Sequence, residues 1–112
     1  MRVGIIGCGN ISETYFESQN LFNNFNIIAC SDINVEVAKK SAEKYSVKAL
    51  SVDDILSSQE VDLIINLTIP SAHKEIIIKS LNAGKHCFSE KPLAINLKEG
   101  MEIFELANLR KL

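Results

Sequence analysis

The chain has 112 residues, of which 46% are hydrophobic, and this is enough to fill the core of one domain. Its formal net charge of −2, with charges of both signs mixed along the chain, argues against a nucleic-acid-binding face and a polybasic membrane patch. No apolar stretch approaches the ~20 residues that cross a bilayer, and residues 1–9 lack the sections of a signal peptide. We therefore expect a cytoplasmic protein.

The first dozen residues predict a strand, a tight turn and the start of a helix. Val3–Ile6 is a short apolar run typical of a strand buried on both faces. The turn that follows has the pattern G-x-G-x-x-S: Gly7 permits a backbone conformation closed to other residues, Gly9 leaves no Cβ in front of a phosphate, and Ser12 allows close helix packing. This pattern predicts a dinucleotide pyrophosphate site, and the alternative is an ordinary strand–helix turn rich in glycine.

Short apolar runs alternate with helical patterns along the whole chain. The runs predict strands at Val3–Ile6, Phe25–Cys30, Val47–Leu50, Val61–Ile69 and Lys85–Ser89. Helices are expected after each of these strands, and four of them have a candidate capping residue: Asn34, Ser51, Ser71 and Asn96. This alternation predicts an α/β fold of the Rossmann type, a doubly wound parallel sheet of order 3-2-1-4-5 with helices on both faces.

The polar and glycine residues that stand out in the sequence follow the ends of the predicted strands. They are Gly7 and Gly9 after the first strand, Asp32 after the second, Thr68 and Pro70 at the end of the fourth, and Glu90 and Lys91 after the fifth. Because parallel strands end at one edge of their sheet, these residues are expected to gather where open α/β sheets bind ligands.

Asp32 follows Gly9 by 23 residues, close to the ~20 expected of a carboxylate that binds the adenosine ribose hydroxyls. Its charge would repel a 2′-phosphate, and no arginine follows it, so NAD is favoured over NADP. Lys39 and Lys40 could reach a 2′-phosphate, which leaves NADP open. The alternative role for Asp32 is that of a loop carboxylate that caps the next helix.

Lys91 is the candidate catalytic residue, because Glu90 and Pro92 restrict its place at the mouth of a strand. An ammonium there can stabilise an alkoxide or relay the hydroxyl proton when a hydride leaves an alcohol. A solvated Glu-Lys pair is the alternative. His73 faces either the nicotinamide end of the crevice or the core, and His86 is expected to be structural.

The three cysteines, Cys8, Cys30 and Cys87, lie far apart and include no Cys-x-x-Cys pair. They predict reduced thiols rather than a disulfide framework, and no set of residues has the spacing of metal ligands. Cys8 lies inside the glycine turn, where a thiolate could be reactive, although a passive small side chain is the simpler interpretation.

Four segments together resemble the N-terminal domain of the glucose-fructose oxidoreductase / inositol dehydrogenase (Gfo/Idh/MocA) family. They are Gly7-Cys-Gly-Asn-Ile-Ser12, Asp32, Thr68-Ile-Pro-Ser-Ala-His73 and Ala83-Gly-Lys-His-Cys-Phe-Ser-Glu-Lys-Pro92. The resemblance covers essentially the whole chain, and the Glu-Lys-Pro element after a Gly-Lys-His strand is its most specific part.

The resemblance implies that residues 1–112 form a Rossmann domain that binds a nicotinamide dinucleotide, NAD or NADP, with Lys91 at the position of the family's catalytic lysine. It assigns Gly7, Gly9, Asn10 and Ile11 to the phosphate loop, and Thr68, Pro70, His73, Glu90 and Lys91 to the nicotinamide site. It implies substrates with a hydroxyl or carbonyl group, commonly sugars, inositols and related polyols.

Two features depart from the family pattern. Ser71 stands where the family often has asparagine. The chain also ends where the family adds a sixth strand and a second domain, which supplies most of the substrate pocket and usually the oligomer interface. We interpret the chain as the cofactor half of a longer homo-oligomeric enzyme, inactive alone. Without a sixth strand, Ile103, Leu106 and Leu109 lack an obvious cover, so we expect an exposed apolar patch or weak self-association.

Two other functions fit part of the pattern. One is a noncatalytic module that binds a dinucleotide and senses its redox state. The other is a methyltransferase-like fold that uses the same turn and acidic residue for S-adenosylmethionine. The Glu90-Lys91-Pro92 element favours the oxidoreductase over both.

Overall fold

Strands and helices alternate along the chain, which a computed structural model describes from residue 1 to residue 112. The strands are β1 (Arg2–Ile6), β2 (Asn26–Ser31), β3 (Lys48–Ala49), β4 (Leu63–Asn66) and β5 (His86–Ser89). The helices are α1 (Ser12–Ser18), α2 (Val35–Tyr45), α3 (Val52–Ser57), α4 (Pro70–Asn82) and α5 (Leu97–Arg110). None of these helices has the length and apolar composition that crossing a membrane requires.

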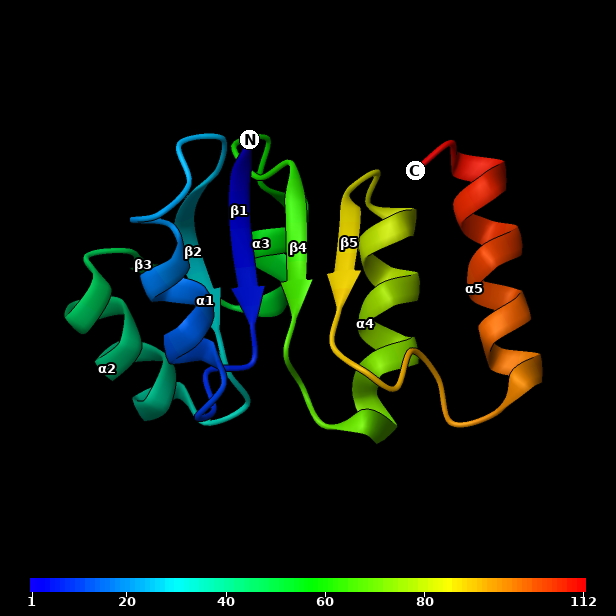
Figure 1. Cartoon of the computed structure of the whole chain (residues 1–112), viewed down its shortest axis with the longest axis horizontal. Coiled ribbons are helices and arrows are strands. Elements are labelled where there is room, and N and C mark those ends of the chain that lie inside the picture. The colour runs from blue at the N-terminus through cyan, green and yellow to red at the C-terminus, as the bar shows by residue number, and fades with distance from the viewer.

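The five strands form one parallel sheet in the order β3-β2-β1-β4-β5, which confirms the predicted Rossmann topology. β1 lies in the middle, and its Ile5 is level with Cys30 of β2 and Ile65 of β4. β1, β4 and β5 run downward in Figure 1, so their carboxyl ends and the loops that follow them lie at the lower edge of the sheet.

Helices cover both faces of the sheet, as predicted. Val3 and Ile5 of β1 pack in one core cluster with Phe16 of α1 and Ala42 of α2. Ile6 points to the opposite face, because successive side chains of a strand alternate, and it packs in a second cluster whose helical residues come from α3 and α4. The sheet is therefore buried on both sides near its centre, where the strands are most apolar.

Three of the four predicted helix caps are confirmed. The side-chain oxygens of Asn34, Ser51 and Asn96 accept hydrogen bonds from backbone N–H groups in the first turns of α2, α3 and α5. The fourth prediction, a cap at Ser71, is wrong: α4 begins one residue earlier, at Pro70, with Ile69 at the cap position. Proline suits the first helical position because its missing N–H would have no partner there.

The predicted strand Val61–Ile69 is also too long, since β4 ends at Asn66. The side chain of Asn66 explains this end. Its Oδ1 accepts hydrogen bonds from the backbone N–H and the hydroxyl of Thr68, and its Nδ2 donates to the carbonyl of His73. These bonds hold the chain in a turn, which an extended strand through Ile69 would not allow.

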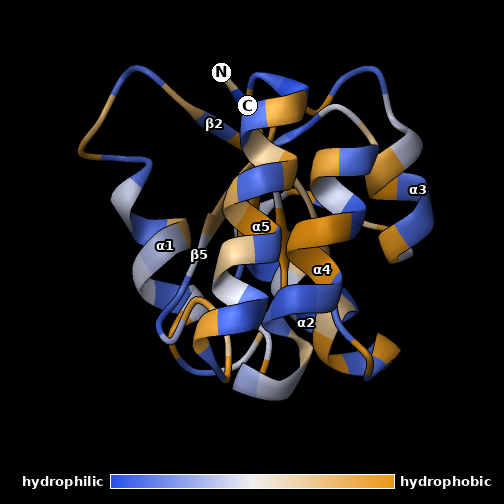
Figure 2. Cartoon of the chain, turned by 90° about the vertical axis from the view of Figure 1, so that its right-hand side faces the viewer, coloured by the Kyte–Doolittle hydropathy of each residue, from blue (hydrophilic) through white to orange (hydrophobic).

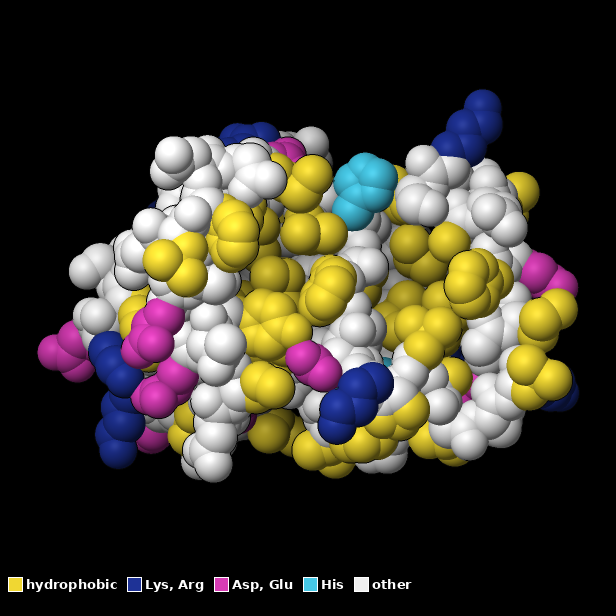
Figure 3. Space-filling view, viewed as in Figure 1, with side chains coloured by type: hydrophobic (Ala, Val, Ile, Leu, Met, Phe, Trp, Pro, Cys, Tyr) yellow, Lys and Arg dark blue, Asp and Glu magenta, His cyan; other side chains and the backbone are white.

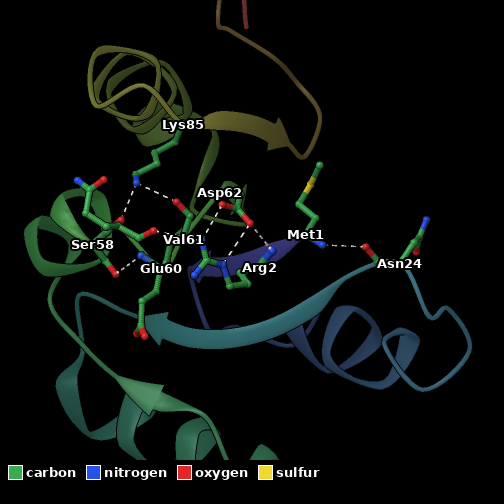
Figure 4. A network of polar contacts seen from close by, with 9 residues as sticks. Met1, Arg2, Asn24, Ser58, Glu60, Val61, Asp62 and Lys85 are labelled. Carbon is green, nitrogen blue, oxygen red and sulfur yellow. Dashed lines mark hydrogen bonds and ion pairs between the residues drawn. The ribbon is translucent and has the colours of Figure 1, made fainter.

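Lys85 joins the loop before β5 to the end of α3, at the amino edge of the sheet. Its buried ammonium donates hydrogen bonds to the carbonyls of Ser58, at 2.6 Å, and Val61, at 2.8 Å (Figure 4). Next to it, Arg2 pairs with Asp62 across β1 and β4 at 3.2 Å, and this contact lowers the pKa of Asp62. The Gly-Lys-His segment thus has a structural lysine.

We expect Lys85→Met to destabilise the fold by about 1–3 kcal/mol, because the apolar stem remains but two carbonyls lose a charged donor. Urea unfolding followed by circular dichroism measures the change. Lys48→Met is the matched control, since Lys48 is exposed and pairs with Glu60 at 3.4 Å, and we expect a change within about 0.5 kcal/mol. Equal effects of the two substitutions would contradict this role of Lys85.

β5 is an edge strand, as predicted, and an apolar groove of about 550 Å³ lies between it and α5. Hydrophobic side chains gather around this hollow over β5 and α5 (Figure 3).

The expectation that Ile103 lacks cover is wrong: it is 5% exposed and packs on Ile77 and Leu81, because α5 lies beside α4 (Figure 2). Leu106 is half-buried and Leu109 is exposed, and the exposed Phe88 and Phe104 line the groove, so the predicted apolar patch is present. Self-association stays a prediction.

Candidate functional site

The glycine turn connects the carboxyl end of β1 to α1. Gly7 has a φ of 101°, and its N–H donates to the carbonyl of Ser31 at 2.8 Å. A Cβ at this position would lie 2.6 Å from the backbone carbonyl of Leu67. Only glycine therefore allows β1 to end this close to the segment after β4.

Gly9, unlike Gly7, has open space around the position of a Cβ. A Cβ added there would have no atom within 4 Å. No hydrogen bond within the chain uses the backbone N–H of Gly9, Asn10 or Ile11. The turn therefore presents free donors beside open space, which is the arrangement that an oxyanion such as a phosphate requires.

Asp32 directly follows β2, and its carboxylate binds the backbone of the glycine turn. One carboxylate oxygen accepts from the N–H of Cys8 and the other from the N–H of Asn34, both at 2.8 Å. The side chain is half-buried, and each of its oxygens can accept a further hydrogen bond. The structure thus places Asp32 against the glycine turn. The alternative role as the cap of the next helix is wrong, because the side chain that caps α2 is that of Asn34, and the role as a ribose ligand stays a prediction.

A cavity of about 890 Å³ opens at this edge of the sheet. Of the predicted residues, it brings together Gly7, Gly9, Asp32 and Thr68. Its other walls are mostly apolar and include Ile33, Val35, Leu50, Val52, Ile69 and Ala72. The wall from Leu50 to Val52 was not predicted as part of the site, although these residues follow the third predicted strand and therefore lie at the same edge of the sheet.

A second group of predicted residues lies after β5, outside this cavity. The carboxylate of Glu90 accepts the hydroxyl of Tyr15 at 2.5 Å and the backbone N–H of Lys91 at 3.2 Å. The hydrogen bond from Tyr15 is the main cause that lowers the pKa of Glu90. Burial and the contact with Glu90 raise the pKa of Tyr15 to about 12. Lys91 is exposed, and no carboxylate lies within ion-pair distance of its ammonium.

His73 is 1% exposed and lies between two backbone carbonyls. Its Nδ1 is 2.6 Å from the oxygen of Pro92, and its Nε2 is 2.8 Å from the oxygen of Thr68. Of the two placements left open by the sequence, the core placement is the one observed. The ring connects the turn after β4 to the loop that carries Lys91. Pro70, the first residue of α4, lies in the same turn.

The cysteines are free thiols. Cys8 and Cys30 are buried on the α1–α2 side of the core. The hydrogen bond with Cys30 and burial raise the pKa of Cys8, which favours the passive interpretation of this side chain. No group of histidine, cysteine, aspartate and glutamate side chains is placed to hold a metal ion.

Comparison with known proteins identifies the family. The model of the Gfo/Idh/MocA oxidoreductase family, NAD-binding Rossmann fold, matches residues 1–112. The chain belongs to this family. This Gfo/Idh/MocA domain is 30% identical over 101 residues to a myo-inositol 2-dehydrogenase from Thermotoga maritima, which covers 88% of the chain and 30% of that relative. The chain thus spans about a third of the length of the relatives it matches.

Two solved structures have the same fold as this chain. A 3-ketoreductase from Actinomadura kijaniata, in complex with NADP, matches 100% of this chain and 35% of its own with a TM-score of 0.94 and 26% identity. The WlbA dehydrogenase from Chromobacterium violaceum, in complex with NADH, matches 99% of this chain and 33% of its own with a TM-score of 0.93 and 26% identity. The fold and the oxidoreductase family are therefore established, and the cofactor is a nicotinamide dinucleotide.

Proposed function

We propose that this domain binds NAD along the carboxyl edge of its sheet and serves as the cofactor half of an enzyme that oxidises or reduces a sugar, inositol or related polyol. The observation that carries the proposal is the single cavity shared by Gly9 and Asp32. Free N–H groups of the glycine turn would hold the pyrophosphate, and the Asp32 carboxylate would accept the adenosine ribose hydroxyls. The apolar walls suit the adenine ring.

A preference for NAD over NADP follows from the charges in this cavity. The carboxylate of Asp32 would repel a 2′-phosphate. Lys39 also lines the cavity, but its ammonium is paired with Glu36 at 3.0 Å. The other lysine that lines the cavity, Lys79, is paired with Glu75 at 2.7 Å. Both lysines are thus partly neutralised, which supports the preference based on Asp32.

The proposed catalytic residue is Lys91. Bound NAD supplies a hydride acceptor, and the substrate hydroxyl must then also lose its proton. The exposed ammonium of Lys91 would stabilise the developing alkoxide or, as the free amine, accept that proton at Nζ. Glu90 and His73 hold the adjoining backbone rather than the reacting atoms, and Thr68 and Pro70 shape the neighbouring turn. The substrate class and a homo-oligomeric assembly stay predictions, based on the relatives.

The test is a titration of NADH emission with the purified chain, which contains no tryptophan. We expect saturable binding of NADH, weaker binding of NADPH, and no displacement of NADH by S-adenosylmethionine. Asp32→Ala should weaken NADH binding about 10- to 100-fold, because hydrogen bonds to a charged group are lost, and should reduce the preference over NADPH.

Asp32→Asn is the milder variant, because its amide oxygen can still accept from the N–H of Cys8 and only the hydrogen bond from the N–H of Asn34 is lost. Unfolding curves of all three proteins separate loss of binding from loss of structure. An unchanged NADH affinity in a folded Asp32→Ala variant would refute the assignment of Asp32.

A further inference from the structure

Tyr15 connects α1 to the loop that carries Lys91. Its hydroxyl donates to Oε1 of Glu90 at 2.5 Å, although the two residues are 75 positions apart. Tyr15 is the fourth residue of α1, the helix that begins directly after the glycine turn. Its ring also lies against Phe88 of β5, with 6.2 Å between ring centroids. One side chain therefore joins the turn proposed for the pyrophosphate to the segment proposed for the chemistry.

Both neighbours of Lys91 are held in place. Glu90 is held by Tyr15 on one oxygen and by the N–H of Lys91 on the other. On the other side, the carbonyl of Pro92 lies 2.6 Å from Nδ1 of the buried His73. The backbone around Lys91 is thus fixed from α1 and from α4, while the lysine side chain itself is exposed.

The hydroxyl of Tyr15 also occupies a position that the Lys91 ammonium could otherwise take. A carboxylate next to an exposed lysine is an attractive partner for its charge. Here Oε1 of Glu90 receives the tyrosine hydroxyl instead. Besides Tyr15, the charged or titratable groups that act on Glu90 are Lys91 and His73. Removal of the hydroxyl would therefore leave Lys91, on the same loop, as a replacement donor.

We infer that Tyr15 is a positioning residue: through Glu90 it fixes the loop around Lys91 and keeps the lysine ammonium free for the substrate. The inference rests on the proposed function in assigning Lys91 to the nicotinamide end of the site. It adds that Tyr15, in the first turn of α1, helps to position the nicotinamide end of the site, whereas the start of this helix was so far assigned only to the phosphate loop.

Tyr15→Phe tests this inference, because it keeps the ring against Phe88 and removes only the hydroxyl. Carbon-detected NMR follows the carboxyl of Glu90 and the side chain of Lys91 against pH. We expect the Glu90 titration midpoint to rise in Tyr15→Phe and the Lys91 resonances to shift toward those of a paired ammonium. In Glu90→Gln, we expect the pKa of Tyr15, followed by its ultraviolet absorbance, to fall below about 12 but to stay raised, because burial of the ring persists and only the contact with the Glu90 charge is lost.

Ligand binding gives a second measurement. ADP-ribose contains the adenosine and pyrophosphate of NADH but no nicotinamide. We expect Tyr15→Phe to weaken NADH binding about two- to tenfold, the effect of one hydrogen bond, and to leave ADP-ribose binding unchanged. Tyr45→Phe is the matched control, because the hydroxyl of Tyr45 is buried without a hydrogen-bond partner. It should change neither the Glu90 titration nor the ratio of the two affinities.

The outcomes separate this inference from the proposed function. Wild-type chain that binds neither NADH nor ADP-ribose would end the proposed function, and the NMR titrations would still show whether Tyr15 controls Glu90 and Lys91. Identical Glu90 and Lys91 titrations in wild type and Tyr15→Phe would overturn the positioning role, even if NADH binds well. Equal weakening of NADH and ADP-ribose would also overturn it, because a general loss of structure would explain that result.

Discussion

Gly7→Ala is expected to destabilise the domain by roughly 3 kcal/mol and to abolish NADH binding in the remaining folded fraction. Gly7 has a φ of 101°, which costs another residue about 1–2 kcal/mol. The new Cβ would also lie 2.6 Å from the backbone of Leu67, and such overpacking typically costs a further ~1–3 kcal/mol. Guanidinium unfolding followed by circular dichroism measures the loss.

Two other glycines provide matched controls for this substitution. Gly9→Ala meets no atom within 4 Å, so we expect little change in stability but weaker NADH binding, because the Cβ would stand where the phosphate approaches. Gly100→Ala lies inside α5 with open space around it and should stabilise the domain by up to ~1 kcal/mol. A Gly7→Ala variant as stable as the Gly100→Ala variant would contradict the close approach of β1 to the segment after β4.

Phe16→Ala is expected to remove about 3–5 kcal/mol of stability, the usual cost of deleting a buried phenyl ring. Phe16 is 0% exposed, and its ring stacks on Tyr45 of α2 with 4.3 Å between centroids. α1 has only seven residues and no side-chain cap, so it depends on tertiary contacts such as this packing to stay on the sheet. The loss approaches the whole stability of a marginal domain, about 5 kcal/mol.

The measurement is thermal unfolding with and without NADH. A bound ligand stabilises the native state by an amount that grows with the logarithm of its concentration over the dissociation constant, so saturating NADH should recover part of the lost melting temperature in Phe16→Ala. Phe104→Ala is the control, because Phe104 on α5 is 63% exposed, and it should cost less than about 1 kcal/mol. Similar losses from the two substitutions would show that α1 does not depend on the buried ring.

Interactions between residues that are near one another in the sequence account for the strands and helices and for much of the proposed cofactor site. The alternation of apolar runs and helical patterns gives the five strands, and the glycine turn indicates the dinucleotide-binding strand order that is observed. The caps at Asn34, Ser51 and Asn96 depend on side chains a few residues from the N–H groups they bind. The positive φ of Gly7 is likewise a local steric property. Asp32 was predictable because parallel strands place their carboxyl ends at one edge.

Contacts between distant residues depend on how the elements pack, and no local pattern contains them. The hydrogen bond from Tyr15 to Glu90, the contact of His73 with the carbonyl of Pro92 and the cover over Ile103 join segments that only the packed elements bring together. Local rules also failed at Ser71, where the neighbouring proline already begins the helix. The sequence by itself determined which residues reach the ligand edge, because strand direction and backbone sterics are local. Only the tertiary structure decided which side chains hold Lys91 there, because hydrogen bonds form between groups that are close in space.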